Sequence, residues 1–317
     1  MKVLVIGGTG HIGTYLVPRL VRAGHEVTVI TRGVREPYRS DPAWGSVRTI
    51  VADREAEDAD GTFASRVAQL EAQVVVDLIC FAPESAQMLI DALHGRIEHF
   101  LHCGTIWVHG STTRPPTTEQ EPRRPFGEYG IRKAAIEDLL LSAARRFGFV
   151  ATVLHPGQIV GPGWVPVNPA GNFNTEVFHS LARGEEVVLP NLGMETLHHV
   201  HADDVAQGFA QAIANRGASL GESFHVVSQT AITLRGYAKL LATWFGQPAQ
   251  LRFQPWESWK ADASEEDSTA TWDHLAHSPC CSIDKARRVL QYEPRYDGFE
   301  AVCESLAWMI DRGELAA

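Results

Sequence analysis

Residues 2–13, KVLVIGGTGHIG, join a short apolar run to a glycine-rich turn and the start of an amphipathic stretch. The glycines are spaced G-x-x-G-x-x-G. Glycine permits a tight turn and lets the backbone approach a pyrophosphate, whose charge then lies against free N–H groups at a helix N-terminus. A glycine-rich turn without a ligand is the alternative, but a strand before it and a helix after it favour dinucleotide binding. The residues expected to contact the dinucleotide are Gly7, Gly10, His11, Ile12 and Gly13.

Short β-rich runs alternate with amphipathic stretches through the first half of the chain. Such alternation implies right-handed βαβ units, and the nearly continuous apolar run VVVDLICF is typical of a strand buried on both faces. The sequence therefore predicts an α/β fold with a doubly wound parallel sheet and a smaller, interleaved C-terminal lobe. We expect residues 1–165 to form the dinucleotide-binding domain, with 200–227 returning to it. Residues 166–199 and 228–317 are expected mainly in the substrate-binding lobe.

The charge and composition of the chain exclude several classes of protein. A formal net charge of −10 argues against a general nucleic-acid binder and against adsorption to an anionic membrane surface. No run approaches the ~20 apolar residues of a membrane span. The five cysteines are an odd number without metal-site spacing. We therefore expect a cytoplasmic protein that binds neither nucleic acid nor a membrane.

The end of the second expected strand, VITRGVR, bears on which dinucleotide is bound. A site for NAD usually offers a carboxylate to the ribose 2′-hydroxyl, whereas a site for NADP offers arginine to the 2′-phosphate. Thr31 and Arg32 stand here, and no acidic residue occurs before Glu36. We therefore expect NADP to be favoured over NAD, with Arg32 at the phosphate. Asp53, after the third strand, is a candidate for contact with the adenine amino group, and capping of a loop is the alternative.

The segment EYGIRKAAIEDLLLSAARRFG reads as a helix with Tyr129 and Lys133 four residues apart on one face of its first turns. A free tyrosine has a pKa near ~10 and is a poor acid–base catalyst at neutral pH. A nearby ammonium stabilises the phenolate and lowers that pKa, so the pair can do chemistry. A half-buried tyrosine beside a solvated lysine is the alternative.

Six motifs, in order along almost the whole chain, resemble those of the extended short-chain dehydrogenase/reductase family of NAD(P)-dependent epimerases and dehydratases. They are GGTGHIG, GTIWVHG, YGIRK, LHPGQIVGPG, HHVHADDVA and KARRVLQYEPRYDGFEAVCESLAWM. The resemblance implies a Rossmann-like fold of two lobes with the substrate in the cleft, and a homodimer. It also implies that Thr105 polarises the substrate oxygen, that Tyr129 is the acid–base group, and that Lys133 tunes Tyr129 and binds the cofactor ribose.

Departures from the family pattern limit which of the family's reactions and substrates fit this chain. Sugar dehydratases of this family carry Asp-Glu directly after the catalytic threonine, whereas this chain has Ile106 and Trp107, neither of which can move a proton. Leu197 replaces an arginine that often holds a sugar-nucleotide diphosphate, and His155 replaces the arginine before Pro156. The arginines that could serve instead are Arg183, Arg235 and Arg252.

Two groups of polar residues in the later chain are further candidates. Asn172 and Asn174 are expected to hydrogen-bond the substrate, with helix capping as an equal alternative. The histidines in HHVH, His198, His199 and His201, suggest a metal because imidazole suits zinc. We expect packing or substrate contact there instead, and no metal.

The expected activity is hydride transfer at a secondary alcohol or ketone carbon of a small molecule, as in an epimerase of sugars or nucleotide-sugars. The alternative is an NADPH-dependent carbonyl reductase that acts on a substrate without a nucleotide. A third possibility is a non-catalytic relative that senses dinucleotides or associates with RNA. The presence of Thr105, Tyr129 and Lys133 together disfavours it.

Overall fold

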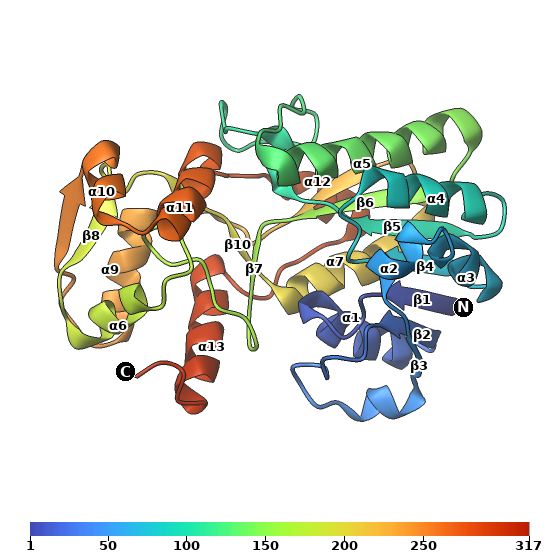
Figure 1. Cartoon of the computed structure of the whole chain (residues 1–317), viewed down its shortest axis with the longest axis horizontal. Coiled ribbons are helices and arrows are strands. Elements are labelled where there is room, and N and C mark those ends of the chain that lie inside the picture. The colour runs from blue at the N-terminus through green and yellow to red at the C-terminus, as the bar shows by residue number, and fades with distance from the viewer. Residues whose placement is uncertain (317) are drawn as a thin grey trace.

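The computed structural model describes residues 1–316, and a sheet of seven parallel strands lies at its centre (Figure 1). Its order is β11-β6-β5-β4-β1-β2-β3, and every neighbouring pair is parallel. The expected α/β fold with a doubly wound parallel sheet is confirmed. The strands of the sheet are β1 (Lys2–Ile6), β2 (Glu26–Thr31), β3 (Arg48–Val51), β4 (Val74–Asp77), β5 (His99–Cys103), β6 (Ala151–Pro156) and β11 (Ser223–Val226).

Each face of the sheet is buried against its own set of helices, because side chains alternate along a strand. In β1, Val3 and Val5 belong to one core, whereas Leu4 and Ile6 belong to the other. The helices that contribute to the first core are α1 (His11–Arg22), α7 (Ala202–Ala214) and α12 (Asp284–Leu290). Those that contribute to the second are α3 (Phe63–Gln69), α4 (Pro83–Leu93) and α5 (Gly127–Phe147). The short helices α2 (Arg54–Ala59) and α8 (Arg216–Ser219) precede α3 and β11.

The helix α5 carries the Tyr-x-x-x-Lys pair, as the sequence predicts. It ends at Gly148, whose φ of +71° is a left-handed conformation that glycine adopts without strain. Ile136 and Leu140 are fully buried in the second core, so the helix is anchored along its length. The register of α5 against the sheet therefore sets where its first turn lies.

The later chain builds a second lobe around a core of its own, seen at the left of Figure 1. Its helices are α6 (Glu176–Arg183), α9 (Leu234–Trp244), α10 (Trp256–Asp262), α11 (Glu265–His277) and α13 (Gly298–Asp311). Its strands pair as β8 (Val187–Pro190) with β13 (Leu251–Gln254), and β9 (Thr196–Leu197) with β12 (Ile232–Thr233). A further pair, β7 (Gln158–Val160) and β10 (His199–His201), lies between the lobes.

The two lobes interleave more than the sequence predicts. Ile283, Ala286 and Tyr292 lie in the first core of the main sheet, although 228–317 was expected mainly in the second lobe. The chain then continues into α13, whose buried residues belong to the core of the second lobe.

The parallel sheet also decides where a site can form. The carboxyl ends of β1, β4, β5 and β6 follow one another along one edge, and the loops after them are the usual place for a ligand in such sheets. Within residues 1–316, no helix is both long enough and apolar enough to cross a membrane.

Candidate functional site

The glycine turn after β1 has the geometry that a dinucleotide needs. Gly7 has a φ of +83°, and its carbonyl accepts a hydrogen bond of 3.1 Å from the N–H of Gly10. Gly10 is the N-cap of α1 and supplies no side-chain cap. A Cβ on Gly10 would meet only the carbonyl oxygen of Gly7, at 3.3 Å, whereas a Cβ on Gly13 would lie 2.1 Å from the carbonyl oxygen of Gly8. Gly13 thus serves close packing, and Gly10 leaves open space above the helix start.

A pocket of about 480 Å³ opens at this turn. It extends from the turn to the ends of β2, β4, β5 and β6, so the loops after these strands all contribute to it. Among the residues that line it are nine of the expected site residues, namely Gly7, Gly10, His11, Ile12, Gly13, Arg32, Thr105, Tyr129 and Lys133. We call it the cofactor pocket.

Thr105, Tyr129 and Lys133 reach the cofactor pocket from two elements. Thr105 is buried at the N-cap of the 3₁₀ helix η2 (Ile106–His109), where its hydroxyl accepts a hydrogen bond of 3.3 Å from the N–H of Trp107. Tyr129 and Lys133 lie in the first turns of α5. The Nζ of Lys133 donates to the carbonyl oxygens of Cys80, at 2.8 Å, and Cys103, at 2.7 Å.

The expectation that Lys133 lowers the pKa of Tyr129 stays a prediction. The protein around the phenol raises the pKa of Tyr129 to about 12, although 42% of the residue remains exposed, and the hydroxyl of Thr105 opposes this only in part. The Nζ of Lys133 lies 5.9 Å from the centroid of the Tyr129 ring, because the two strand-end carbonyls hold it. At neutral pH the phenol therefore carries its proton and can donate it.

The far end of the cofactor pocket is lined by Thr31, Arg32, Val34 and Arg35, at the end of β2. The hydroxyls of Thr31 and Thr9 lie 2.8 Å apart, which ties this strand end to the glycine turn. Asp53 is not brought into the pocket. Its carboxylate caps α2 by accepting hydrogen bonds from two backbone N–H groups at 3.0 and 3.2 Å, which was the alternative reading of this residue.

Two aromatic side chains cover the glycine turn, and sequence reasoning did not find them. The indole of Trp164 stacks on the imidazole of His11 with 5.2 Å between ring centroids, and the ring of Tyr38 meets His11 edge-on at 5.8 Å. Tyr38 also packs so closely on Gly163 that a Cβ there would lie 2.2 Å from its ring. The loops that carry Tyr38 and Trp164 therefore meet above the turn.

Aromatic rings also crowd the turn after Thr105. Trp107 stacks on His277 of α11, with 4.1 Å between centroids, and meets the ring of Tyr129 edge-on at 5.9 Å. Phe126 stacks on His277 from another side, at 4.0 Å. His277 belongs to the range 228–317, which the sequence places mainly in the second lobe, and no local motif predicts this contact with Trp107 and Phe126.

Asn172 and Asn174 do not line the cofactor pocket; they hold the second lobe together instead. The amide of Asn172 is buried and donates to the hydroxyl of Thr271 at 3.0 Å. Asn174 accepts from the N–H of Glu176 at the start of α6 and donates to Asp267, both at 3.0 Å. Both asparagine side chains therefore hydrogen-bond within their own lobe, in agreement with the alternative of helix capping rather than substrate binding.

The three histidines of HHVH contact different parts of the molecule. His198 bonds to the carbonyl of Ser228 at 2.9 Å, and His199 packs edge-on against the ring of Tyr237. His201 caps α7 by accepting from the N–H of Asp203. The expectation that these side chains serve packing fits these contacts.

The arginines considered for a diphosphate are engaged elsewhere. Arg183 pairs with Glu176 and Glu185, and Arg252 pairs with Glu186. The guanidinium of Arg235 lies 5.0 Å from the centroid of the Phe253 ring, which belongs to β13.

Comparisons with known proteins identify the family and similar chains. The NAD dependent epimerase/dehydratase family matches residues 3–226. Chloroplast stem-loop binding protein of 41 kDa b from Arabidopsis thaliana is 27% identical, over 98% of this chain and 80% of that protein. The 2′-dehydrokanamycin reductase of Streptomyces kanamyceticus is 26% identical, over 99% of this chain and 86% of that protein. The structure of UDP-glucose 4-epimerase from Thermotoga maritima with UDP-glucose has a TM-score of 0.73 and 21% identity, over 98% of this chain and 99% of that chain.

Replacing Gly10 tests the turn without disturbing the fold. We expect Gly10→Val to raise the dissociation constant for the dinucleotide at least about tenfold, because the added methyl groups occupy space that the pyrophosphate needs. Fluorescence titration measures the constant, and circular dichroism checks folding. Gly45→Val is the matched control, since a Cβ at Gly45 meets nothing within 4 Å. Unchanged affinity in folded Gly10→Val would remove this turn from the site.

Proposed function

This chain belongs to the NAD dependent epimerase/dehydratase family, and from that premise we propose that it moves hydride at a secondary alcohol or ketone carbon of a sugar-type substrate, as an epimerase does. It is an NAD(P)-dependent enzyme of the extended short-chain dehydrogenase/reductase type. The observation that carries the proposal is the meeting of Thr105, Tyr129, Lys133 and the glycine turn in one pocket.

The residues present fit a dinucleotide. The open space at Gly10 and the helix start at His11 suit a pyrophosphate, and Lys133 uses two of its three ammonium donors on backbone carbonyls. The third donor is free to bind a ribose hydroxyl. When bound, the nicotinamide supplies or accepts the hydride.

The protein's own part in the reaction is to hold one oxygen and move one proton. The Thr105 hydroxyl donates a hydrogen bond to the substrate oxygen and aligns it. In reduction, Tyr129 gives its proton to that oxygen as hydride reaches the carbon; in oxidation the proton returns to the tyrosine oxygen. The neutral phenol is the form required for reduction, whereas oxidation, the first step of an epimerase, needs the phenolate to accept the proton.

One feature favours an epimerase over a dehydratase. Ile106 is buried and Trp107 is stacked on His277, so neither position offers the acid–base pair that water loss requires.

A carbonyl reductase acting on a substrate without a diphosphate is the second candidate. It is favoured by the engagement of Arg183, Arg235 and Arg252 in other contacts, because a diphosphate would need such a group. The similarity to 2′-dehydrokanamycin reductase points in the same direction.

Identification of the dinucleotide that purifies with the protein separates the two candidates. The purified protein is denatured, and the released dinucleotide is identified by chromatography together with its redox state. For an epimerase we expect close to one oxidised dinucleotide per chain. An empty protein that consumes NADPH with ketone substrates would contradict the epimerase and support the reductase. If the protein neither binds nor consumes a dinucleotide, both candidates are contradicted.

Tyr129→Phe tests the proposed acid–base group. We expect turnover to fall about 100- to 10,000-fold with nearly unchanged cofactor affinity, because only the proton-transferring hydroxyl is lost. Steady-state rates and cofactor titration measure the two effects. Tyr296→Phe is the control, because this ring stacks on His201 outside the cofactor pocket. A Tyr129→Phe rate within a few-fold of wild type would exclude Tyr129 as the catalyst.

We further propose that NADP binds more tightly than NAD. Arg32 and Arg35 line the pocket at the end of β2, and the residues that line it within 1–316 include no Asp or Glu. A guanidinium pairs with a 2′-phosphate through two parallel charge-assisted hydrogen bonds.

The cofactor preference is tested with Arg32→Asp. We expect wild-type protein to favour NADP about tenfold, or roughly 1.4 kcal/mol, and Arg32→Asp to narrow or reverse that ratio. Dissociation constants for both dinucleotides measure it. Arg48→Asp is the matched control, because Arg48 is exposed at the opposite end of the strands. Equal or tighter binding of NAD by wild-type protein would contradict the proposal.

We propose a homodimer through α4 and α5, which pack side by side, because the family resemblance implies one.

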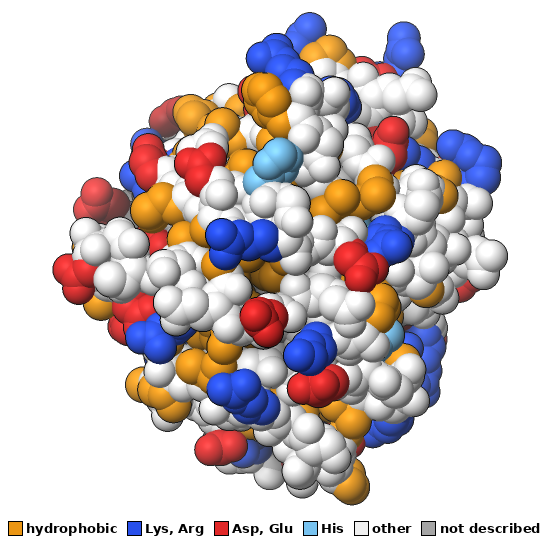
Figure 2. Space-filling view, turned by 90° about the vertical axis from the view of Figure 1, so that its right-hand side faces the viewer, with side chains coloured by type: hydrophobic (Ala, Val, Ile, Leu, Met, Phe, Trp, Pro, Cys, Tyr) orange, Lys and Arg blue, Asp and Glu red, His pale blue; other side chains and the backbone are white. Residues whose placement is uncertain are grey.

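A cytoplasmic location is proposed because all five cysteines are free thiols. No nucleic-acid partner is proposed, since the net charge is −10 and the face in Figure 2 mixes basic with acidic side chains.

A further inference from the structure

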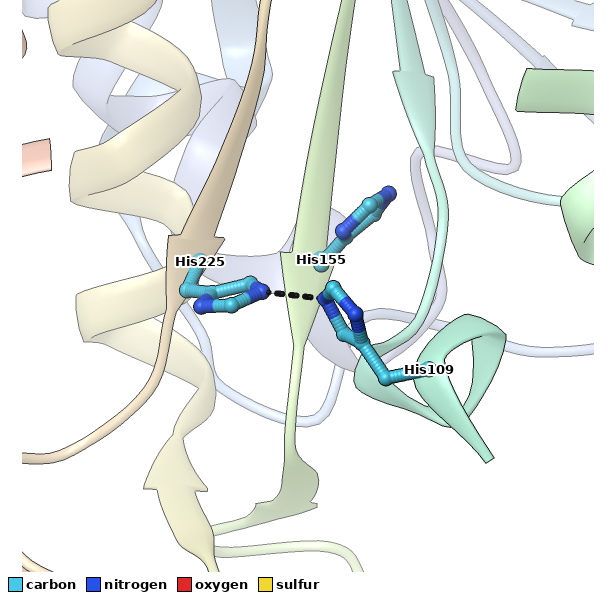
Figure 3. A group of neighbouring side chains, drawn as sticks. All are labelled: His109, His155 and His225. Atoms are coloured by element: carbon cyan, nitrogen blue, oxygen red, sulfur yellow. Dashed lines mark hydrogen bonds between the residues drawn. The ribbon is translucent and has the colours of Figure 1, made fainter. Parts of the chain in front are cut away.

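Three buried histidines converge behind the turn that carries Thr105 (Figure 3). His155 of β6 and His225 of β11 are directly paired in the sheet, and His109 ends η2. One ring nitrogen of each lies within 4.8 Å of those of the other two. We call these three residues the histidine cluster. It differs from the HHVH group considered above, and its members are not among the residues that line the cofactor pocket.

The outward nitrogens of two of these rings face acceptors. The Nδ1 of His225 lies 3.1 Å from the carbonyl oxygen of Ser282, so it carries the proton of a neutral imidazole. The Nε2 of His155 lies 3.5 Å from a carboxylate oxygen of Glu137. A histidine that binds a metal almost always directs its second nitrogen to a carboxylate or a carbonyl in this way, which orients the ring.

The inward nitrogens lie close enough for one ion to reach all three. The Nε2 atoms of His109 and His225 are joined by a hydrogen bond of 2.8 Å, and the nearest nitrogen of His155 lies within 4.8 Å of both (Figure 3). Tetrahedral zinc with bonds of about 2.0 Å needs its nitrogens roughly 3.3 Å apart, so the rings must rotate and the hydrogen bond must break when the ion binds.

Nearby carboxylates can balance the charge of a cation. Glu137 accepts hydrogen bonds from Arg123 at 2.7 and 3.1 Å. The carboxylate of Glu119 lies 4.0 Å from the Nδ1 of His225. A cavity of about 750 Å³ is lined by Glu119, Glu137 and Ser282, and so reaches the outer side of the cluster.

We propose that His109, His155 and His225 bind one divalent transition metal ion, with zinc the best match to three neutral imidazoles. Three nitrogen ligands leave a fourth position for water. The ion would act as a positioning element for catalysis, because His109 ends the turn that Thr105 begins. His155 also packs on Gly104, where a Cβ would lie 2.5 Å from its ring.

Metal binding to the whole protein tests this proposal. Chelator-treated protein is titrated with Co²⁺ and Zn²⁺; we expect one ion per chain, a tetrahedral Co²⁺ absorption band displaced by Zn²⁺, and a higher melting temperature with Zn²⁺. X-ray absorption at the zinc edge of wild-type protein is expected to show three imidazole ligands. No stoichiometric binding, or fewer than three imidazoles, would overturn the site without any variant.

Matched variants connect the ion to these residues. His225→Asn retains a donor toward the Ser282 carbonyl but lacks the Nε2 ligand, and we expect its zinc affinity to fall at least about 100-fold. His155→Gln retains a polar group toward Glu137 and serves as the second ligand variant. The control is His99→Gln, which replaces a buried histidine bonded to Thr152 outside the cluster and is expected to bind zinc like wild type. Zinc affinity that is unchanged in both ligand variants would place the ion elsewhere and overturn the proposal.

Discussion

The buried ammonium of Lys133 holds the catalytic part of this molecule together. It donates to the carbonyl of Cys103 at the end of β5 and to that of Cys80 just beyond β4, and it lies 4.5 Å from the centroid of the Phe81 ring. A charge this far from water costs several kcal/mol unless its donors are used. The two carbonyls therefore bind α5 to the edge of the sheet, and they set where Tyr129, one turn earlier, enters the pocket.

The same two carbonyls hold the ammonium of Lys133 5.9 Å from the centroid of the Tyr129 ring. The protein around the phenol raises the pKa of Tyr129. Any positive charge that enters the pocket favours the phenolate and so lowers the pKa of Tyr129. The pKa of Tyr129 therefore depends on what the pocket contains.

Next to Tyr129, the second lobe contributes an aromatic ring stack rather than charged side chains. Trp107, His277 and Phe126 form a stack beside Tyr129, and this stack joins the turn after β5 to α11. Stacked rings present flat, weakly polar surfaces. Behind the same turn the histidine cluster adds buried polar contacts, so the Thr105 segment is supported on two sides.

The sequence alone determined the features that depend on neighbours in the chain. The alternation of strands and helices, the glycine turn, and the four-residue spacing of Tyr129 and Lys133 follow from local periodicity, and so the sheet and most of the pocket could be predicted. The sequence also revealed that Ile106 and Trp107 depart from the dehydratase pattern, because they adjoin a recognisable motif.

Only the tertiary structure decided which polar groups are free to act. Asp53, Asn172 and Asn174 are used by caps and turns, and no local pattern separates such a residue from one that binds a ligand. Other contacts arise only where distant loops and strands pack together. Trp164 stacks on His11 in this way, and His109 hydrogen-bonds His225, 116 residues later in the chain.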